Sequence, residues 1–276
     1  NYGKRFGFGD LYLVDLETGD VVYSVAKHPD FLTSLKRGPF AQTKLGQAFR
    51  QAALAESEDY VALTDYENYV PAFAEPVGFA ASPIFSGEKK IGVAILQIPI
   101  KAISQILEER TGLGETGETY AVGRDLTFRT PPRFTEQFNV RSAVLDPGVL
   151  ATTLAVDSAL KGQEGTLITT DYRGLAVLSS WTPLVIEPPS DLHPEGVHWA
   201  LVSQMHLDEV QAPILATWKV FLIVAIGTGV LILIVSLMFA NGMTRQTDAI
   251  VEMLSAIGIG DFQARAEVVS RHELGT

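Results

Sequence analysis

The sequence contains no cysteine, which excludes disulfide bonds and thiolate metal sites. Basic residues are also scarce, because 21 lysines and arginines stand against 32 aspartates and glutamates, and the formal net charge is -11. Nucleic-acid-binding surfaces are basic, so this balance argues against a nucleic-acid partner.

Motifs for catalysis, metals and cofactors are missing as well. The five histidines are scattered without ligand spacing, and no serine lies in a Gly-x-Ser-x-Gly context. The letters Gly112-x-Gly114-x-x-Gly117 match a dinucleotide fingerprint, but they follow a predicted helix and precede a predicted strand, the reverse of the order that phosphate binding needs. We expect no enzyme activity, metal or cofactor from this segment.

Charge is absent from residues 220–240, where Thr228 and Ser236 are the only side-chain hydroxyls. As a helix this run is about 31 Å long, which matches the hydrocarbon core of a bilayer. A buried core helix seldom stays apolar on every face for this length. The run therefore predicts a transmembrane helix at 218–241 in contact with lipid.

The residues around this run suggest its orientation. No signal peptide or second hydrophobic run precedes it, so we expect a signal or a first membrane helix upstream. Lys219 precedes the run, whereas Arg245, Arg265 and Arg271 follow it, which favours a cytoplasmic C-terminal side.

The part ahead of the run predicts an α+β fold of two similar units, each an antiparallel sheet with helices on one face. The first unit is expected to begin with a hairpin over 10–25, in which Leu11, Leu13 and Leu16 face Val21, Val22 and Val25. It continues with a helix over 41–56, strands over 60–64, 77–85 and 91–97, and a helix after Pro99.

The second unit repeats this pattern after a boundary at 112–117. Its expected elements are a strand over 118–123 extended by 127–129, a helix over 151–160, strands over 166–171, 175–183 and 199–205, and a helix over 207–217 with Pro213 as a bend. The predicted domains are thus 1–111, with a further part upstream, then 112–206, a juxtamembrane helix over 207–217, and the membrane helix.

Beyond the membrane run, an apolar seam indicates a parallel helical partner. Ile250, Met253, Leu254 and Ile257 follow the spacing i, i+3, i+4, i+7, and glycines at 258 and 260 end the pattern.

Several stretches resemble a known family. Gly114–Tyr120, Gly-Glu-Thr-Gly-Glu-Thr-Tyr, resembles a segment of double Cache (dCache-type) extracytoplasmic sensor domains. Residues 9–24 and 171–178 look like hairpins of that family's membrane-distal and membrane-proximal modules. Thr244-Arg245, Gly260-Asp261-Phe262 and Glu273-Leu274-Gly275 resemble the first helix and connector of a HAMP domain, with Gln246 and His272 departing from its pattern.

The resemblance implies two PAS-like Cache modules, one transmembrane helix and the start of a HAMP parallel coiled coil over 242–276. It further implies a homodimeric, chemoreceptor-like protein of the bacterial inner (cytoplasmic) membrane with a periplasmic or extracellular sensor. Such a protein passes its signal to cytoplasmic partners through an output domain, often of the methyl-accepting chemotaxis type. Gly260 and Glu273 are the residues singled out for signalling.

The first unit contains the candidate ligand residues. Asp65, Tyr66 and Tyr69 follow a strand, and a carboxylate beside tyrosines can hold a ligand ammonium. Tyr23, Lys27 and Arg37 are expected to meet a ligand carboxylate from the opposite wall, and Gln97 on the last strand has an amide that can bond either ligand group. An amino acid or organic acid is the expected ligand, although the arginine-tryptophan-tyrosine pattern of amino-acid-binding members is not visible. The alternative is that these residues bind no ligand: Asp65 caps a turn, the tyrosines are half-buried sheet residues, and Lys27 is solvated.

Two other functions stay open from the sequence. The chain can be the sensory part of a membrane nucleotide cyclase or a sensor histidine kinase, with its catalytic domain beyond the C-terminal end. It can also be a membrane anchor that binds no ligand.

Overall fold

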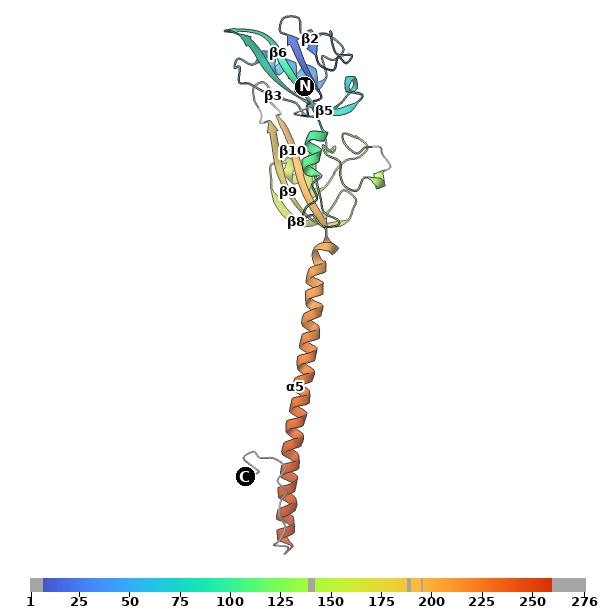
Figure 1. Ribbon diagram of the computed structural model, residues 1–276, viewed down its shortest axis with the longest axis vertical. Helices are drawn as coiled ribbons and strands as arrows, with labels where there is room; N and C mark the ends of the chain where they lie inside the picture. The colour runs from blue at the N-terminus through green and yellow to red at the C-terminus, as the bar shows by residue number, and fades with distance from the viewer. Residues whose placement is uncertain (1–6, 139–141, 188–189, 195, 260–276) are drawn as a thin grey trace. The chain divides into compact units, whose positions relative to one another are not determined.

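In the computed structural model, residues 7–138, 142–187, 190–194 and 196–259 are described. The chain divides into two units, Asn1–Val210 and Gln211–Thr276. The first unit contains two antiparallel sheets with short helices, and one long helix runs into the second unit (Figure 1). The structure thus confirms the predicted α+β class.

The first sheet has six strands in the order β2-β1-β6-β5-β3, with β4 also paired to β5. Every pairing is antiparallel. The strands are β1 (Asp10–Asp15), β2 (Val21–Ser24), β3 (Ala62–Leu63), β4 (Glu67–Tyr69), β5 (Glu75–Ser86) and β6 (Lys89–Pro99). A single 3-10 turn, η1 (Val70–Ala72), follows β4. The short strand β4 was not expected from the sequence.

The predicted β1–β2 hairpin forms, but its buried residues are the predicted ones only at Val21. On β1, Tyr12 and Val14 are buried in place of Leu11 and Leu13, and on β2 and after it Val22 and Val25 are exposed. Side chains alternate between the two faces of a strand, so a prediction that is one residue out of step on β1 exchanges its two faces.

Helix α2 (Lys44–Leu54) covers this sheet with the stripe that its periodicity predicts: Leu45, Ala48, Phe49 and Ala52 are all buried. Thr43 begins the helix, because its side chain accepts a hydrogen bond from the Gly46 N–H. The stripe joins a core with Phe79 and Ile95 of the sheet, and burial of a side chain such as Phe49 contributes about 1.5–3 kcal/mol.

The second sheet has four strands in the order β7-β10-β9-β8, all antiparallel. They are β7 (Glu118–Gly123), β8 (Gly165–Thr170), β9 (Ala176–Glu187) and β10 (Val197–His206). Helix α3 (Lys101–Leu107) precedes β7, the 3-10 turn η2 (Glu136–Phe138) follows it, and helix α4 (Leu154–Leu160) packs against β9 and β10. Of the expected strand extension over 127–129, Thr127 and Phe128 form isolated bridges instead.

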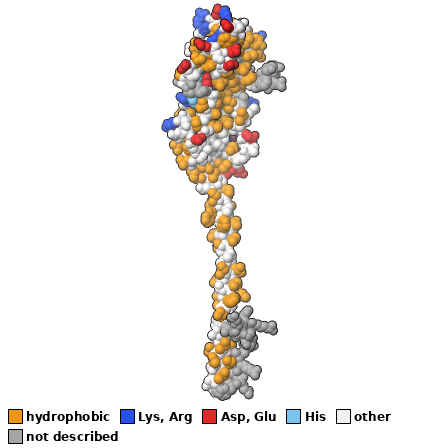
Figure 2. Space-filling model, turned by 90° about the vertical axis from the view of Figure 1, so that its left-hand side faces the viewer, with side chains coloured by type: hydrophobic (Ala, Val, Ile, Leu, Met, Phe, Trp, Pro, Cys, Tyr) orange, Lys and Arg blue, Asp and Glu red, His pale blue; other side chains and the backbone are white. Residues whose placement is uncertain are grey.

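Helix α5 (Leu207–Gly258) begins at the residue after β10 and contains Pro213. It is the one helix among the described residues that is long and apolar enough to cross a membrane. Its apolar side chains face outward, with Leu222, Ile223 and Phe239 being 62%, 69% and 73% exposed (Figure 2). A helix with this surface needs an apolar environment on all sides. The predicted signalling residues Gly260 and Glu273 lie outside the described residues.

Candidate functional site

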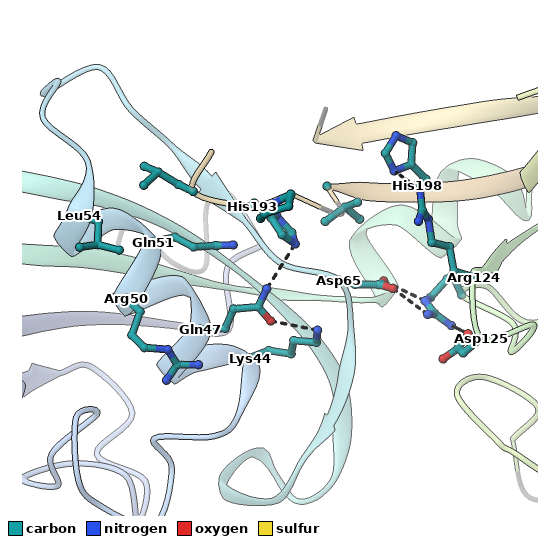
Figure 3. A pocket seen from close by; sticks show the side chains of 15 residues that line it. Lys44, Gln47, Arg50, Gln51, Leu54, Asp65, Arg124, Asp125, His193 and His198 are labelled. Carbon is teal, nitrogen blue, oxygen red and sulfur yellow. Dashed lines mark hydrogen bonds and ion pairs between the residues drawn. The ribbon is translucent and has the colours of Figure 1, made fainter. Parts of the chain in front are cut away.

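A hollow of the first unit lies where its two sheets meet, and we call it the junction cleft (Figure 3). Its volume is about 680 Å³, within the range of small-molecule sites. Helix α2 and Asp65 line it from the first sheet, and the loops around Asp125 and His193 line it from the second. The lining residues used below are Lys44, Gln47, Gln51, Asp65, Arg124, Asp125, Arg129, His193 and His198.

Two side chains from the part of the chain that contains the second sheet hold the Asp65 carboxylate. Arg129 donates from Nε to Oδ1 at 2.9 Å and from Nη2 to Oδ2 at 2.7 Å, which is a bidentate pair. The indole Nε1 of Trp199 donates to Oδ1 at 3.0 Å. Since the Arg129 side chain is 3% exposed and that of Asp65 25%, this pair is shielded from water and joins the two sheets.

Arg129 has a second carboxylate partner. Its Nη1 lies 3.0 Å from Oδ1 of Asp125 and also donates to Thr127. Burial opposes the charged guanidinium, but the hydrogen bonds and charges of Asp65 and then Asp125 outweigh it and raise the pKa of Arg129. The cation is therefore fixed as an ion-pair centre at the cleft wall.

A second polar contact crosses the junction through His193. Its Nδ1 lies 2.8 Å from Oε2 of Glu187 at the end of β9, and its Nε2 lies 3.3 Å from the Gln47 amide nitrogen on α2. Lys44 donates to the Gln47 amide oxygen at 3.0 Å, which orients the amide. A carboxylate can only accept and the amide nitrogen can only donate, so Nδ1 of His193 has the proton and Nε2 accepts.

Asp65 and Tyr66 are the two predicted ligand residues at this junction, and Asp65 lines the cleft. The Tyr66 ring packs on Trp199 with 5.7 Å between ring centroids. Burial, and then the charge of Asp65, raise the pKa of the Tyr66 phenol. The Tyr66 phenol therefore stays protonated, and the Tyr66 ring makes mainly apolar contacts.

Tyr69 and Gln97 lie elsewhere, in a buried polar group inside the first sheet's core. Tyr69 donates to Oδ2 of Asp30 at 2.7 Å, and Tyr12 donates to the Gln97 side-chain oxygen at 2.9 Å. Oδ1 of the buried Asp30 has no hydrogen-bond partner in the described part of the chain. Burial and the charge of Asp30 raise the pKa of both tyrosines.

Tyr23 and Lys27 are at the exposed end of the β1–β2 hairpin, and neither lines the junction cleft. Tyr23 is 46% exposed. The structure thus places these six predicted residues in three separate groups. The described opposite wall of the cleft comes from Arg124, Asp125, Arg129 and the residues 192–194 and 196–198.

The sequence did not reveal Arg129, Trp199, Gln47 or Glu187. Arg129 and Trp199 lie 64 and 134 positions from Asp65, and no local spacing signals such a contact. His193, one of the five scattered histidines, is 9% exposed and bonded on both ring nitrogens.

Within the described ranges, no group of histidine, aspartate and glutamate side chains has the geometry of a metal site. The junction cleft also contains no hydroxyl or lysine nucleophile bonded to a base among the contacts of its described lining. Its described lining presents charged and amide groups on two facing walls.

No protein-family model and no curated protein matches the chain. Solved structures with a similar fold include the ligand-binding domain of the Pseudomonas aeruginosa PAO1 amino acid chemoreceptor PctB in complex with L-Arg, with 17% identity, 74% of each chain covered and a TM-score of 0.47. The ligand-binding domain of the Pseudomonas fluorescens chemoreceptor CtaA in complex with L-serine gives 16% identity, 73% of this chain and 74% of that chain covered, and a TM-score of 0.44.

An extracellular ligand binding receptor from Desulfohalobium retbaense gives 16% identity, covers 72% of this chain and 30% of that chain, and has a TM-score of 0.46. At these identities and TM-scores the likenesses assign neither a ligand to this chain nor a role to any of its residues.

Proposed function

We propose that this chain is the sensory and membrane-spanning part of a transmembrane receptor. The observation that supports this most is the direct passage from sheet to helix: His206 ends β10 and Leu207 begins α5. Because no loop intervenes, a displacement of the second sheet reaches the helix without being absorbed by a flexible connection.

A second contact fixes the start of α5 to the segment between the two sheets. The Glu209 carboxylate, in the first turn of α5, accepts hydrogen bonds from the backbone N–H groups of Glu115 and Thr116 at 2.8 Å each, and from the Thr116 hydroxyl. Gly114 has a φ of +62° and would bring an added Cβ into contact with the same carboxylate. In this proposal the Gly114–Tyr120 segment serves to hold the helix start, which couples it to both sheets.

The remaining parts of the proposal follow the resemblance. Residues 218–241 contact lipid of a bacterial cytoplasmic membrane, and the first unit is periplasmic or extracellular. A small molecule, an amino acid or organic acid, binds on the first sheet's side of that unit and favours one of two arrangements. The signal passes to a HAMP-like segment containing Gly260 and Glu273, and from there to cytoplasmic partners through an output domain of the methyl-accepting type.

The proposed receptor is a homodimer whose α5 helices pair in parallel along Ile250, Met253 and Ile257. Single cysteines at these three positions should form intersubunit disulfides in membranes after mild oxidation, because they repeat along one seam. Ser255→Cys is the matched control, since Ser255 lies on α5 between them but off the seam. Equal cross-linking at Ser255, or none at the three seam positions, would show that the parallel pairing is wrong.

A further inference from the structure

His206, the last residue before α5, has an arginine as its side-chain partner. Its Nε2 lies 2.6 Å from Nη2 of Arg173, which is in the turn between β8 and β9. A guanidinium can only donate, so at this distance Nε2 of His206 accepts and the imidazole is neutral. Protonation places an N–H on both ring nitrogens, and an imidazolium can no longer accept from Arg173.

Arg173 is held where it is by Asp171. The Asp171 carboxylate accepts from Nε of Arg173 at 2.7 Å and lies 2.7 Å from Nη2, and the two side chains are 6% and 0% exposed for Arg173 and Asp171. The Phe134 ring covers the guanidinium, with 4.1 Å between the guanidinium carbon and the ring centroid. Two positive charges at hydrogen-bond distance repel each other. Because the guanidinium is fixed, a protonated His206 ring has to move.

His206 also contacts the residues that hold the start of α5. Its backbone N–H donates to the Thr116 hydroxyl oxygen at 3.1 Å, and the same hydroxyl donates to the Glu209 carboxylate. Hydrogen bonds from Thr116 and Glu115 lower the pKa of Glu209 most, and a positive charge on His206 lowers it further. An imidazolium that leaves Arg173 is therefore attracted to Glu209 in the first turn of α5.

The surroundings of the His206 ring contain few other charges. Phe134 stacks on the ring with 5.9 Å between centroids, and the strand neighbour on β9 is the apolar Val177. The described charged side chains of the elements around His206 are Arg173 and Asp171 of the turn before β9, Arg133 beside Phe134, Glu115 of the segment before β7, and Asp208 and Glu209 of α5.

We infer that His206 is a proton-sensitive contact between the second sheet and α5: the neutral ring accepts from Arg173, and the protonated ring leaves Arg173 for Glu209. Histidine is the side-chain type that changes charge between about pH 5 and 8. Since His206 and Leu207 are consecutive, a movement of the ring acts at the first residue of α5. The inference adds the proton as an input beside the small molecule, and it rests on the proposed function for the passage of that movement along α5.

The test is NMR spectroscopy of the full chain in lipid nanodiscs with isotope-labelled arginine and histidine. A hydrogen bond between the two side chains gives a nitrogen–nitrogen scalar coupling between Nη2 of Arg173 and Nε2 of His206. We expect this coupling at about pH 8, and its loss together with a shift of the Arg173 signals at about pH 5.

His206→Gln should keep the Arg173 signals unchanged across this range, because an amide oxygen accepts at both pH values. His198→Gln is the matched control, since Nδ1 of His198 also lies 3.3 Å from an arginine nitrogen, that of Arg124, and the Arg173 signals should titrate in it as in the unsubstituted chain. Thermal unfolding verifies that both variants fold. Absence of the coupling at about pH 8, its persistence at about pH 5, or an Arg173 titration that survives in His206→Gln would overturn the inference.

Cross-linking of Ile250→Cys in membranes, with and without His206→Gln, tests whether the proton acts on α5. The ratio of cross-linking in the two chains should change about twofold or more between the two pH values, a change of about 0.4 kcal/mol in the seam. Cross-links that form equally in both chains at both pH values would also overturn the inference. No cross-link at either pH, with the coupling and its loss intact, would contradict the dimeric receptor and leave the His206 contact standing.

Discussion

At the scale of single residues, the Asp65–Arg129 pair is the contact whose loss we expect to matter most. Asp65→Asn removes the charged half of a shielded, bidentate pair and leaves Asp125 as the carboxylate partner of the buried Arg129, so it should lower the free energy of unfolding by about 2 kcal/mol. Urea unfolding of the full chain, followed by tryptophan fluorescence, measures this change.

The matched control is Asp157→Asn. Asp157 pairs with Lys161 at 2.6 Å on α4, but the two side chains are 59% and 65% exposed. An exposed pair at this spacing contributes about 0.3–0.5 kcal/mol. Equal destabilisation by the two substitutions would show that Asp65 does not hold the sheets together.

The hydrogen bonds that the Glu209 carboxylate accepts from Glu115 and Thr116 should be lost at acid pH. The Thr116 hydroxyl, and then the N–H groups of Glu115 and Thr116, lower the pKa of Glu209 below its ordinary value of 4.5. A lowered pKa means that the contact is fully present above pH 4.5 and is lost as the pH falls through the lower folded value. The amide signals of Glu115 and Thr116 in NMR spectra should therefore titrate with a midpoint below 4.5.

Glu209→Gln is the control for this titration, because its amide does not ionise and the two signals should stay constant. A midpoint at or above the ordinary glutamate value in the unsubstituted chain would contradict the contact.

Residue identity singled out one group that lines the junction cleft but not the groups that hold it. Asp65 was singled out as a charged group near tyrosines, and it does line the junction cleft. Its partners Arg129 and Trp199 belong to the other sheet, so their contact depends on how two separately folded layers meet. Such a contact has no periodicity and no fixed spacing in the sequence.

At the scale of elements, the first turn of α4 gives a direct test of local structure. Thr153 begins the helix, and its hydroxyl accepts from the Val156 N–H at 3.2 Å. Thr153→Ala should lower the free energy of unfolding by about 1 kcal/mol, the usual contribution of such a cap. The adjacent Thr152→Ala changes an exposed residue outside the cap and should have an effect within about 0.5 kcal/mol. Equal effects in urea unfolding would show that Thr153 does not cap the helix.

Elements with a strong periodic pattern were predicted well. The bounds of β7 agree with the expected 118–123, and the buried stripe of α2 is the predicted one. Elements with a weak pattern were not predicted. Strand β4 has three residues, which are too few to show the alternation of apolar and polar side chains. In the β1–β2 hairpin, leucines and valines occur on both faces, and the buried Tyr12 decides which face points to the core.

At the scale of the whole chain, the sequence predicted two sheets followed by one apolar helix. It also predicted a helix over 207–217 that leads to the membrane run with Pro213 as a bend, and in the structure one helix, α5, covers both stretches and contains Pro213. Proline removes the one hydrogen bond that its N–H would donate to the Glu209 carbonyl but leaves the flanking turns intact, and the Thr217 hydroxyl donates to the Pro213 carbonyl at 2.8 Å. This continuity is the physical basis of the proposed signalling route.

The most direct test of that route asks whether the two ends of α5 face opposite sides of a membrane. The chain has no cysteine, so Gln163→Cys before the helix and Ser255→Cys near its end each introduce a single reactive thiol at an exposed position. In intact bacterial cells, a membrane-impermeant maleimide should label the cysteine at position 163 at once, and the cysteine at 255 only after the cytoplasmic membrane is permeabilised. Labelling of both in intact cells, or of neither until permeabilisation, would place the two ends on the same side and contradict the receptor.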